Sequence, residues 1–423
     1  MSITTLNIRE DSFLVNGKKT YSEIENSNGN VHGLLMNARF IQGIFDDKTS
    51  RSRYNRFGCL FDPEKNTDDL IRALPAWYKY GLRAFTVGFQ GGGPCYTTDS
   101  NLIDNNPFAC DGKSMDPSYA ARMDRLIKAA DKIGMAIIVS YFYGMQSRRL
   151  EGGQAVINAV KTATRFLKDG GYTNVIIEIA NEQNVEAFKV HPILYQSEGI
   201  VALMEIARHE TDSLPIGCSL TGGEADKEIT QASDVVLIHG NGCSRGSYHR
   251  LIKTVREWAP GKPVVCNEDS PAIGQLNVAL KTRTSWGYYN NMTKQEPPID
   301  WGITRGEDEF FAYRMAEGIG IKQPEIPRER QYYLQGLEPD MTCDGKRWIR
   351  LASLYPETID DVEFYRNGVI VDTAFDEPFS LNYCSNWYQH PWFVKPDDKL
   401  WESMVHLKDG RVIQVKRDDT VFS

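Results

Sequence analysis

The sequence predicts an α/β fold in which a (β/α)8 (TIM) barrel precedes a small antiparallel β-domain. Eight short strand-like runs, rich in apolar and β-branched residues, lie between residues 31 and 289. Most of them are separated by helical patterns, and this alternation is typical of a parallel sheet that eight strands can close into a barrel. After residue 339 the pattern changes to runs that alternate with a period of two, as antiparallel strands do.

We therefore expect a barrel domain over residues 1–338 and a small β-sandwich-like domain over residues 339–423. The chain has 423 residues, which fits one large domain and one small one. An N-terminal hairpin is expected in the first domain, because Asn16-Gly17 favours a tight turn. Strands of the second domain are expected at residues 348–352, 362–371 and 410–415.

The barrel elements are predicted in chain order. The eight strands are expected at residues 31–36, 84–90, 135–142, 175–179, 216–220, 235–239, 263–267 and 285–289. Helices are expected from Asn66 to Gly81, and at about residues 117–133, 154–168, 272–283 and 308–318. The second of these helices has the clearest start, with Asp116 at the cap and Pro117 at the first position.

Two of the predicted strands end in a carboxylate. The fourth run leads into Asn181-Glu182, and the seventh run ends in Glu268. Right-handed crossovers place the carboxyl ends of all parallel strands on one face, so both acids are expected at one cavity. Two facing carboxylates are what cleavage of a glycosidic bond needs, one to protonate the leaving oxygen and one to attack the anomeric carbon.

A strand followed by Asn181-Glu182, with a later strand followed by Glu268, resembles the retaining (β/α)8 glycoside hydrolases of clan A, such as the cellulase and mannanase families. The resemblance implies that Glu182 is the acid/base, that Glu268 is the nucleophile, and that Asn181 holds the sugar 2-hydroxyl or the second carboxylate. It implies a carbohydrate substrate, no metal and no cofactor. Glu182 would then need a raised pKa, and Glu268 would need to stay ionised.

The sequence departs from the family pattern at two positions. The tyrosine usual on the sixth strand is missing, since the run there is His239-Gly240-Asn241, and we expect Asn241 to replace it. The arginine usual on the second strand is also missing, because Thr86 occupies that place, and Arg39 is expected to supply the positive charge. His239 is expected to contact substrate or to orient Glu268, although a structural histidine is nearly as good an interpretation.

Further substrate contacts are expected from side chains near the ends of other strands. Trp286 on the eighth strand matches the aromatic platform on which a sugar ring stacks. Tyr143 and Gln90, which follow the third and second strands, are weaker candidates for subsites. Glu178 is expected to be a buried acid paired with a basic side chain.

The C-terminal domain offers a second place for carbohydrate. It could bind sugars through Trp387, Tyr388 and Trp392, but packing on the barrel is the preferred interpretation.

Composition limits the partners. A net charge of −8 argues against a nucleic-acid partner and an anionic membrane surface, and no apolar run is long enough to span a bilayer. The N-terminus as written predicts no secretory signal, which fits either a cytoplasmic protein or a mature form with an added start. The 8 cysteines have no zinc-type spacing, and a Cys95–Cys110 disulfide is a minority interpretation for an exported protein. Nothing in the sequence predicts an oligomeric state.

Two other functions compete with glycoside hydrolysis. A metal-dependent hydrolase on the same barrel would want His-x-His after the first strand, where this chain has Asn37-Ala38-Arg39, and there are only 7 histidines in all. A carbohydrate-binding pseudoenzyme would keep the cleft without turnover. The missing tyrosine and arginine favour the pseudoenzyme, whereas the presence of both carboxylates argues against it.

Overall fold

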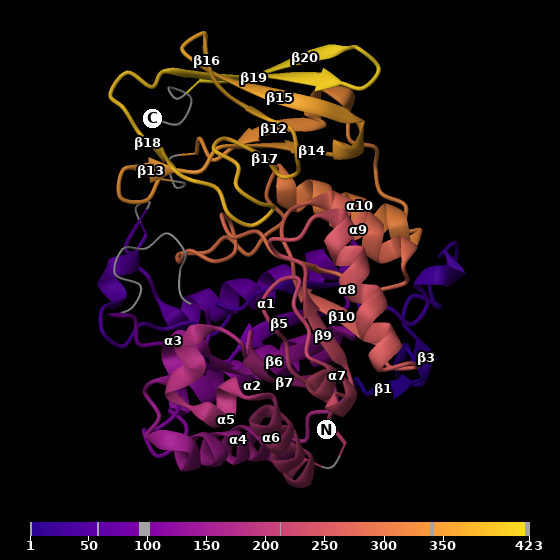
Figure 1. The fold of residues 1–423 in the computed structure, drawn as a ribbon, viewed down its shortest axis with the longest axis vertical. Coiled ribbons are helices and arrows are strands. Elements are labelled where there is room, and N and C mark those ends of the chain that lie inside the picture. The colour runs from indigo at the N-terminus through magenta and orange to yellow at the C-terminus, as the bar shows by residue number, and fades with distance from the viewer. Residues whose placement is uncertain (1, 57–58, 93–101, 212, 339–341, 419–423) are drawn as a thin grey trace.

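The structure is a computed structural model, and it describes residues 2–56, 59–92, 102–211, 213–338 and 342–418. Strands and helices alternate in its N-terminal part, and antiparallel strands form its C-terminal part (Figure 1). The α/β class and the antiparallel C-terminal strands are as predicted. Cys95, one partner of the disulfide considered above, lies outside the described residues.

A six-stranded parallel sheet forms the centre of the N-terminal part, in the order β11-β4-β5-β6-β7-β8. Its strands are β4 (Asn37–Arg39), β5 (Ala84–Gly88), β6 (Ala136–Tyr143), β7 (Val175–Asn181), β8 (Ile216–Gly217) and β11 (Gly287–Tyr288). A separate parallel pair consists of β9 (Val236–His239) and β10 (Val264–Glu268). Most of these strands lack exposed residues, as expected for a parallel sheet covered on both faces.

Backbone hydrogen bonds connect the two sheets at both of their seams. The amides of Asp234 and Val235, just before β9, donate to the Ile216 carbonyl of β8 at 2.8 and 3.4 Å. On the other side the Cys266 amide of β10 donates to the Ser285 carbonyl, two residues before β11, at 2.9 Å. Val265 and Ser285 also form a parallel bridge.

The predicted strand positions need one correction, at the first strand. Residues 31–36 contain no strand, and β4 begins only at Asn37. Gly33 has a φ of +87°, and the Leu34 amide donates to the Val31 carbonyl, so the chain turns there instead of extending. The other seven predicted runs each contain or adjoin a parallel strand.

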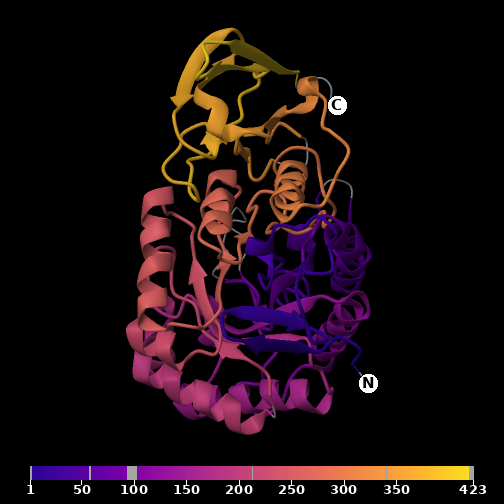
Figure 2. The ribbon, with the colours of Figure 1, turned by 90° about the vertical axis from the view of Figure 1, so that its right-hand side faces the viewer.

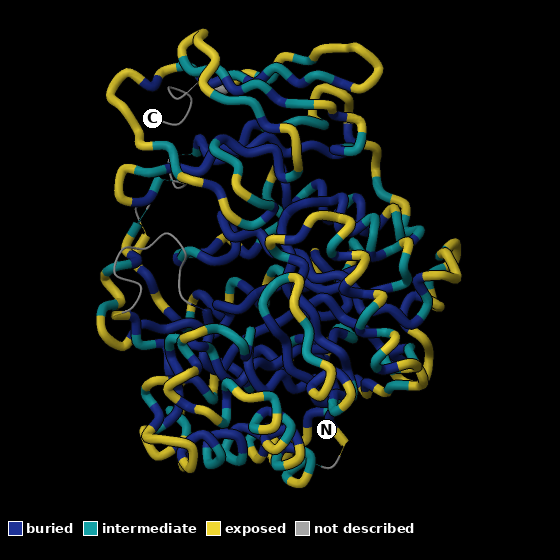
Figure 3. The backbone as a smooth tube through the Cα atoms, in the orientation of Figure 1, coloured by how far each residue is buried: buried dark blue, intermediate teal, exposed yellow. Residues whose placement is uncertain are grey.

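Helices cover the outside of the parallel strands (Figure 2). They are α1 (Pro63–Lys79), α2 (Pro117–Ile133), α3 (Gly144–Ser147), α4 (Gly152–Asp169), α5 (Pro192–Tyr195), α6 (Ser197–Glu210), α7 (Lys227–Ala232), α8 (Arg245–Trp258), α9 (Ile273–Lys281) and α10 (Glu307–Ile319). Helix α1 starts three residues before the predicted Asn66, because Asp62 caps it through the amides of Glu64 and Lys65. The buried residues lie mainly in the strands and on the helix faces that pack against them (Figure 3).

The N-terminal hairpin packs against the amino ends of the parallel strands. It consists of β1 (Leu6–Arg9), β2 (Ser12–Val15) and β3 (Lys18–Lys19), with Asn16 and Gly17 at positive φ in the predicted tight turn. Leu6 and Phe13 belong to a buried cluster completed by strand or adjacent residues Leu35, Ala84, Ala136, Ile138, Ile176, Val235, Leu237 and Val265. The hairpin thereby fills the space opposite to the strands' carboxyl ends.

The C-terminal strands form three antiparallel sheets with a hydrophobic cluster of their own. They are β12 (Tyr332–Gln335), β13 (Lys346–Arg347), β14 (Arg350–Ser353), β15 (Ile359–Arg366), β16 (Val369–Ala374), β17 (Phe379–Ser380), β18 (Trp392–Phe393), β19 (Leu400–Leu407) and β20 (Val412–Asp418). Strand β12 precedes the predicted boundary at residue 339 and pairs with β14. The predicted Asn-Gly turn is present at Asn367-Gly368, between β15 and β16.

Candidate active site

Glu182 follows the last residue of β7, and Ser219 in the loop after β8 holds its backbone. Its backbone has a φ of +52°, a left-handed conformation that costs roughly 1–3 kcal/mol for a residue other than glycine. Ser219 offsets this cost, since its Oγ accepts from the Glu182 amide at 3.1 Å and its carbonyl accepts from the Gln183 amide at 3.0 Å. The Glu182 side chain is 20% exposed, and His239 Nδ1 lies 3.0 Å from its Oε1.

Glu268 ends β10, and an irregularity in that strand directs its side chain. Cys266 pairs with Ile238 and Glu268 pairs with His239, so the pairing skips Asn267. Such a bulge turns a side chain that strict alternation would send to the other face of the sheet. Only 6% of the Glu268 side chain is exposed. Its Oε1 accepts from Asn241 Nδ2 at 3.0 Å, and its Oε2 forms an ion pair with Arg39 Nε at 2.8 Å.

Four more of the predicted residues surround the two carboxylates, namely Arg39, Asn181, His239 and Asn241. Arg39, at the end of β4, also donates from Nη2 to Asn181 Oδ1 at 2.8 Å. His239 Nδ1 lies 3.6 Å from Glu268 Oε2 as well as 3.0 Å from Glu182, so it contacts both acids. Arg39 is paired in register with Thr86 of β5, which places the guanidinium next to the position where the clan A pattern has its arginine.

A glycine in the sixth-strand run is required by close packing. A Cβ at Gly240 would lie 2.0 Å from Asp269 Oδ2, so no larger residue fits between His239 and Asn241. Asp269 is fully buried and accepts from the Trp286 indole nitrogen at 2.7 Å. The run His239-Gly240-Asn241 therefore fits closely against the residue that follows Glu268.

The pKa values of the two acids have the opposite order to the one expected. Burial raises the pKa of Glu268 to about 7, against the lowering effect of the Arg39 and His239 charges. Burial also opposes ionisation of Glu182, but the hydrogen bond to His239 and the positive charges of His239 and Arg39 hold the pKa of Glu182 below its ordinary value. The pKa of His239 is raised despite its burial, because both carboxylates favour the imidazolium. Glu268 is the more deeply buried of the two acids, and Glu182 has the shorter contact with His239, so both effects favour this order.

Trp286 and Gln90 are not available for substrate contacts, which corrects two of the predictions. Trp286 is fully buried, and a ring without exposed surface cannot stack on a sugar. Gln90 is also fully buried, with its amide donating to Asn106 Oδ1 and its carbonyl accepting from the Tyr143 amide. Tyr143 is partly exposed and lies opposite Asn181 in the β6–β7 register, so it reaches the edge where the acids lie.

Glu178 lies four residues before Glu182 and is fully buried. Its Oε1 accepts from Asn267 Nδ2 at 3.0 Å, and none of the described ion pairs involves it. The partner of Glu178 is therefore an amide instead of the predicted basic side chain. The negative charge of Glu178 contributes to raising the pKa of both Glu268 and Arg39.

Glu182, His239 and Glu268 also have the chemistry of a metal site. One carboxylate or imidazole atom from each lies within 4.8 Å of the others. Two carboxylates and an imidazole are ligands for zinc or manganese. The Arg39 guanidinium, however, already lies 2.8 Å from Glu268 and would repel a cation bound there. Among the described residues this set therefore fits acid/base chemistry better than metal binding.

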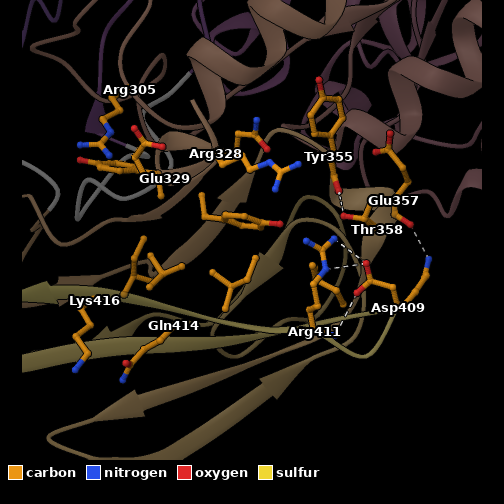
Figure 4. A pocket seen from close by; sticks show the side chains of 18 of the residues that line it. Arg305, Arg328, Glu329, Tyr355, Glu357, Thr358, Asp409, Arg411, Gln414 and Lys416 are labelled. Carbon is orange, nitrogen blue, oxygen red and sulfur yellow. Dashed lines mark hydrogen bonds and ion pairs between the residues drawn. The ribbon is translucent and has the colours of Figure 1, made fainter. Parts of the chain in front are cut away.

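A large groove lies away from these acids, in the C-terminal part (Figure 4). Its volume is about 1180 Å³, and both signs of charge line it, with Arg411 and Asp409 paired to each other. None of the predicted site residues lines this groove.

None of the helices in the described part of the chain is long and apolar enough to cross a membrane.

Two residues close to the site were not predicted there. Tyr289 follows β11 directly, and the Arg39 guanidinium lies 5.5 Å from the centre of its ring. Trp387, from the segment between β17 and β18, stacks on Tyr289 with 5.1 Å between ring centres. Tyr289 has a local signal, since it ends the eighth strand-like run, whereas no local pattern connects Trp387 to the barrel.

Comparisons with known proteins find similarity in structure. No protein-family model and no curated protein sequence matches the chain. A solved structure from Bacteroides vulgatus ATCC 8482, of a protein to which glycoside hydrolase activity is attributed, superposes with a TM-score of 0.52 at 11% identity, covering 99% of this chain and 80% of that one. A β-glucosidase from Thermotoga maritima gives a TM-score of 0.47 at 10% identity, over 71% of this chain and 100% of that chain. An endo-β-1,4-mannanase from Thermotoga petrophila gives 0.43 at 11% identity, over 90% and 96%. The first of these similarities is sufficient to show a shared fold.

Proposed function

We propose that the chain is a retaining glycoside hydrolase that cleaves O-glycosidic bonds of an oligo- or polysaccharide, with Glu182 as acid/base and Glu268 as nucleophile. One observation carries the proposal: carboxylate oxygens from the ends of two separate strands lie within 4.8 Å of each other. Retaining enzymes hold their carboxyl groups about 5–5.5 Å apart, whereas inverting enzymes need roughly 6.5–9.5 Å to admit a water. The short separation supports double displacement.

In the proposed mechanism the two acids share one proton. In the reactive form the proton lies on Glu182, which gives it to the leaving oxygen while Glu268 Oε2 or Oε1 attacks the anomeric carbon. Glu182, now ionised, then takes a proton from water, and the resulting hydroxide displaces Glu268 from the sugar. Arg39 and Asn241 stabilise the charge on Glu268 when it is released, and His239 holds the Glu182 carboxylate between the two steps.

We also propose two features of the fold, the closure of the barrel and the division of the chain into two domains. The two parallel sheets form one closed eight-stranded barrel, which is supported by the hydrogen bonds from Asp234 and Val235 to Ile216 and from Cys266 to Ser285. The chain has two domains, which is supported by the separate hydrophobic cluster of the C-terminal strands. Because Leu334 and Leu337 belong to that cluster and β12 pairs with β14, we place the boundary before β12 instead of at the predicted residue 339. In such a barrel the carboxyl ends of the strands carry the active site.

The test is turnover of a panel of aryl glycosides and of plant, algal and bacterial polysaccharides. Wild type is compared with Glu182→Ala and Glu268→Ala, and with Glu186→Ala as a matched control, since Glu186 is a highly exposed carboxylate paired with Lys189. Glu182→Ala is expected to lower kcat on natural glycosides by about 10²–10⁴-fold, whereas Glu186→Ala leaves it unchanged.

Azide distinguishes the two roles, because it can replace either missing carboxylate. With Glu182→Ala, azide attacks the glycosyl-enzyme and gives a glycosyl azide of retained configuration. With Glu268→Ala, azide attacks the substrate directly and gives the inverted product. Full activity in Glu268→Ala without azide would contradict the assignment, and a wild type that turns over no member of the panel would contradict the proposed function.

A further inference from the structure

A segment of the C-terminal part lies over the strand ends that carry the two acids. Asn386, in the segment between β17 and β18, accepts a hydrogen bond from the Gly242 amide, and its own amide donates to the Gly240 carbonyl at 3.3 Å. These two glycines flank Asn241, which holds Glu268. The segment is therefore attached to the same loop that positions the proposed nucleophile.

Trp387 extends this attachment to the opposite side of the site. Its carbonyl accepts from Asn291 Nδ2 at 3.2 Å, and its indole is stacked on the Tyr289 ring at an interplanar angle of 30°. Tyr289 in turn lies beside Arg39, the partner of Glu268. Three side chains thus form a continuous row from the nucleophile's ion pair to the C-terminal part.

The accessible ring in this row is Trp387. Tyr289 is only 2% exposed and Trp286 is fully buried, whereas Trp387 is partly exposed. Tyr289 stacks on one face of the Trp387 indole, so a sugar would have to stack on the other face. The stacking function expected of Trp286 can therefore be met by a residue from outside the predicted barrel.

A buried polar network fixes the loop on which Trp387 rests. Arg350 of β14 donates to Asn290 Oδ1 at 3.0 Å and to Asn291 Oδ1 at 3.1 Å, and it forms an ion pair with Glu307 at 2.7 Å. The side chains of Arg350 and Glu307 are 1% and 5% exposed. The loop after β11 and the C-terminal sheet are thus joined by charge-assisted bonds that solvent screens little.

We propose that Trp387 is the platform on which the sugar ring stacks beside Glu182 and Glu268, so that the C-terminal part completes the active site. The inference rests on the proposed glycoside hydrolase function. An indole binds the C–H face of a sugar through dispersion and apolar burial. The platform selects pyranoses whose axial hydrogens gather on one face, as in β-linked glucose units, over sugars with an axial hydroxyl on that face.

The test compares Trp387→Ala and Trp387→Phe with Phe393→Ala on 4-nitrophenyl β-glycosides of glucose, galactose and mannose. Phe393 is the matched control, because it is an aromatic residue of β18, is 64% exposed and has Lys346 over its ring. Trp387→Ala is expected to raise KM about tenfold on the best of these sugars with little change in kcat, because the contact is made equally in ground and transition states. Trp387→Phe keeps an apolar ring in the same place and is expected to give an intermediate KM. Phe393→Ala should match wild type.

Two results distinguish the inference from the function on which it rests. If wild type hydrolyses a glycoside and both Trp387 variants match Phe393→Ala in KM, the platform is wrong and the hydrolase proposal stands. If wild type hydrolyses no member of the panel and its thermal unfolding is unchanged by the corresponding free sugars, both proposals fall. Should Trp387→Ala not fold, the KM of Trp387→Phe and its preference among the three sugars decide the question.

Discussion

Asn241 offers the sharpest perturbation of the proposed nucleophile. Its amide makes the one hydrogen bond that Glu268 Oε1 accepts in the described part of the chain, at 3.0 Å. A hydrogen bond to a charged group contributes about 1.5–3 kcal/mol. At about 1.4 kcal/mol for each factor of ten, Asn241→Ala is expected to lower kcat/KM by about 10- to 150-fold.

Asn241→Ala is also expected to change the pH dependence of kcat/KM. Loss of a bond to the ionised form raises the pKa of Glu268 further above its present value of about 7. The alkaline limb of the kcat/KM profile is therefore expected to move up by about one to two pH units, since the lost bond contributes about 1.5–3 kcal/mol and one unit corresponds to about 1.36 kcal/mol. A slower enzyme with a higher alkaline limb is not what general damage to the site would produce.

The assay is the pH dependence of kcat/KM on the best aryl glycoside from the panel. Asn184→Ala is the matched control, because Asn184 is also a loop asparagine near the site but hydrogen-bonds Thr221 instead of a carboxylate. The control is expected to leave the alkaline limb where wild type has it. If Asn241→Ala keeps wild-type kcat/KM, or loses activity with an unmoved limb, Asn241 does not stabilise the charge of Glu268.

Three further predictions concern the acids, the joint between the two parts, and metals. Wild-type kcat/KM should be bell-shaped in pH, with both acids protonated below an acid limb that the lowered pKa of Glu182 sets, and both ionised above an alkaline limb at about 7; a plateau continuing to pH 9 would contradict this. Arg350→Ala should lower the free energy of unfolding in urea by about 3–5 kcal/mol, because it leaves the buried Glu307 without its cationic partner, whereas Arg411→Ala should leave that free energy nearly unchanged, since its pair with Asp409 is exposed. Equal losses would refute that reasoning. Dialysis against EDTA should leave kcat/KM unchanged, since Arg39 supplies the positive charge beside Glu268, and recovery of lost activity on adding zinc or manganese would show the reverse.

Much of the fold could be predicted because its signals are local. Buried β-branched runs mark the parallel strands, Asn16-Gly17 and Asn367-Gly368 mark two turns at positive φ, and an Asp-Pro pair marks the start of α2. The same Asp-Pro signal is present at Asp62-Pro63, where it marks the true start of α1. The predicted first strand differs from the observed β4 because an apolar run containing Gly33 resembles a strand, whereas its backbone turns.

The site could be predicted in part, because strand ends converge but side-chain directions depend on tertiary detail. The gathering of Arg39, Asn181, His239 and Asn241 around the acids follows from their positions at strand ends. The bulge that turns Glu268 inward is set by pairing with β9, which a sequence does not display. The order of the two pKa values likewise depends on tertiary detail, namely the deeper burial of Glu268 and the shorter contact of Glu182 with His239.

Long-range contacts explain the remaining errors. Trp286 has the position of a platform but is buried by its bond to Asp269 and by the packing of Phe311. Trp387 lies about one hundred residues further along, and only the packing of the C-terminal part brings it to Tyr289. Glu178 was expected beside a basic group, yet Asn267 is the side chain that the neighbouring strands bring to it.

The central claim is a covalent glycosyl-enzyme at Glu268, and trapping that intermediate tests it most directly. Wild type is incubated with the 2-deoxy-2-fluoro derivative of its best aryl glycoside, which slows breakdown of the intermediate, and the labelled peptide is identified by mass spectrometry. We expect one sugar per chain, attached to Glu268, and no label in Glu268→Gln. A sugar attached to Glu182 or Asp269 would contradict the assignment, and rapid hydrolysis with inversion and no label would contradict double displacement itself.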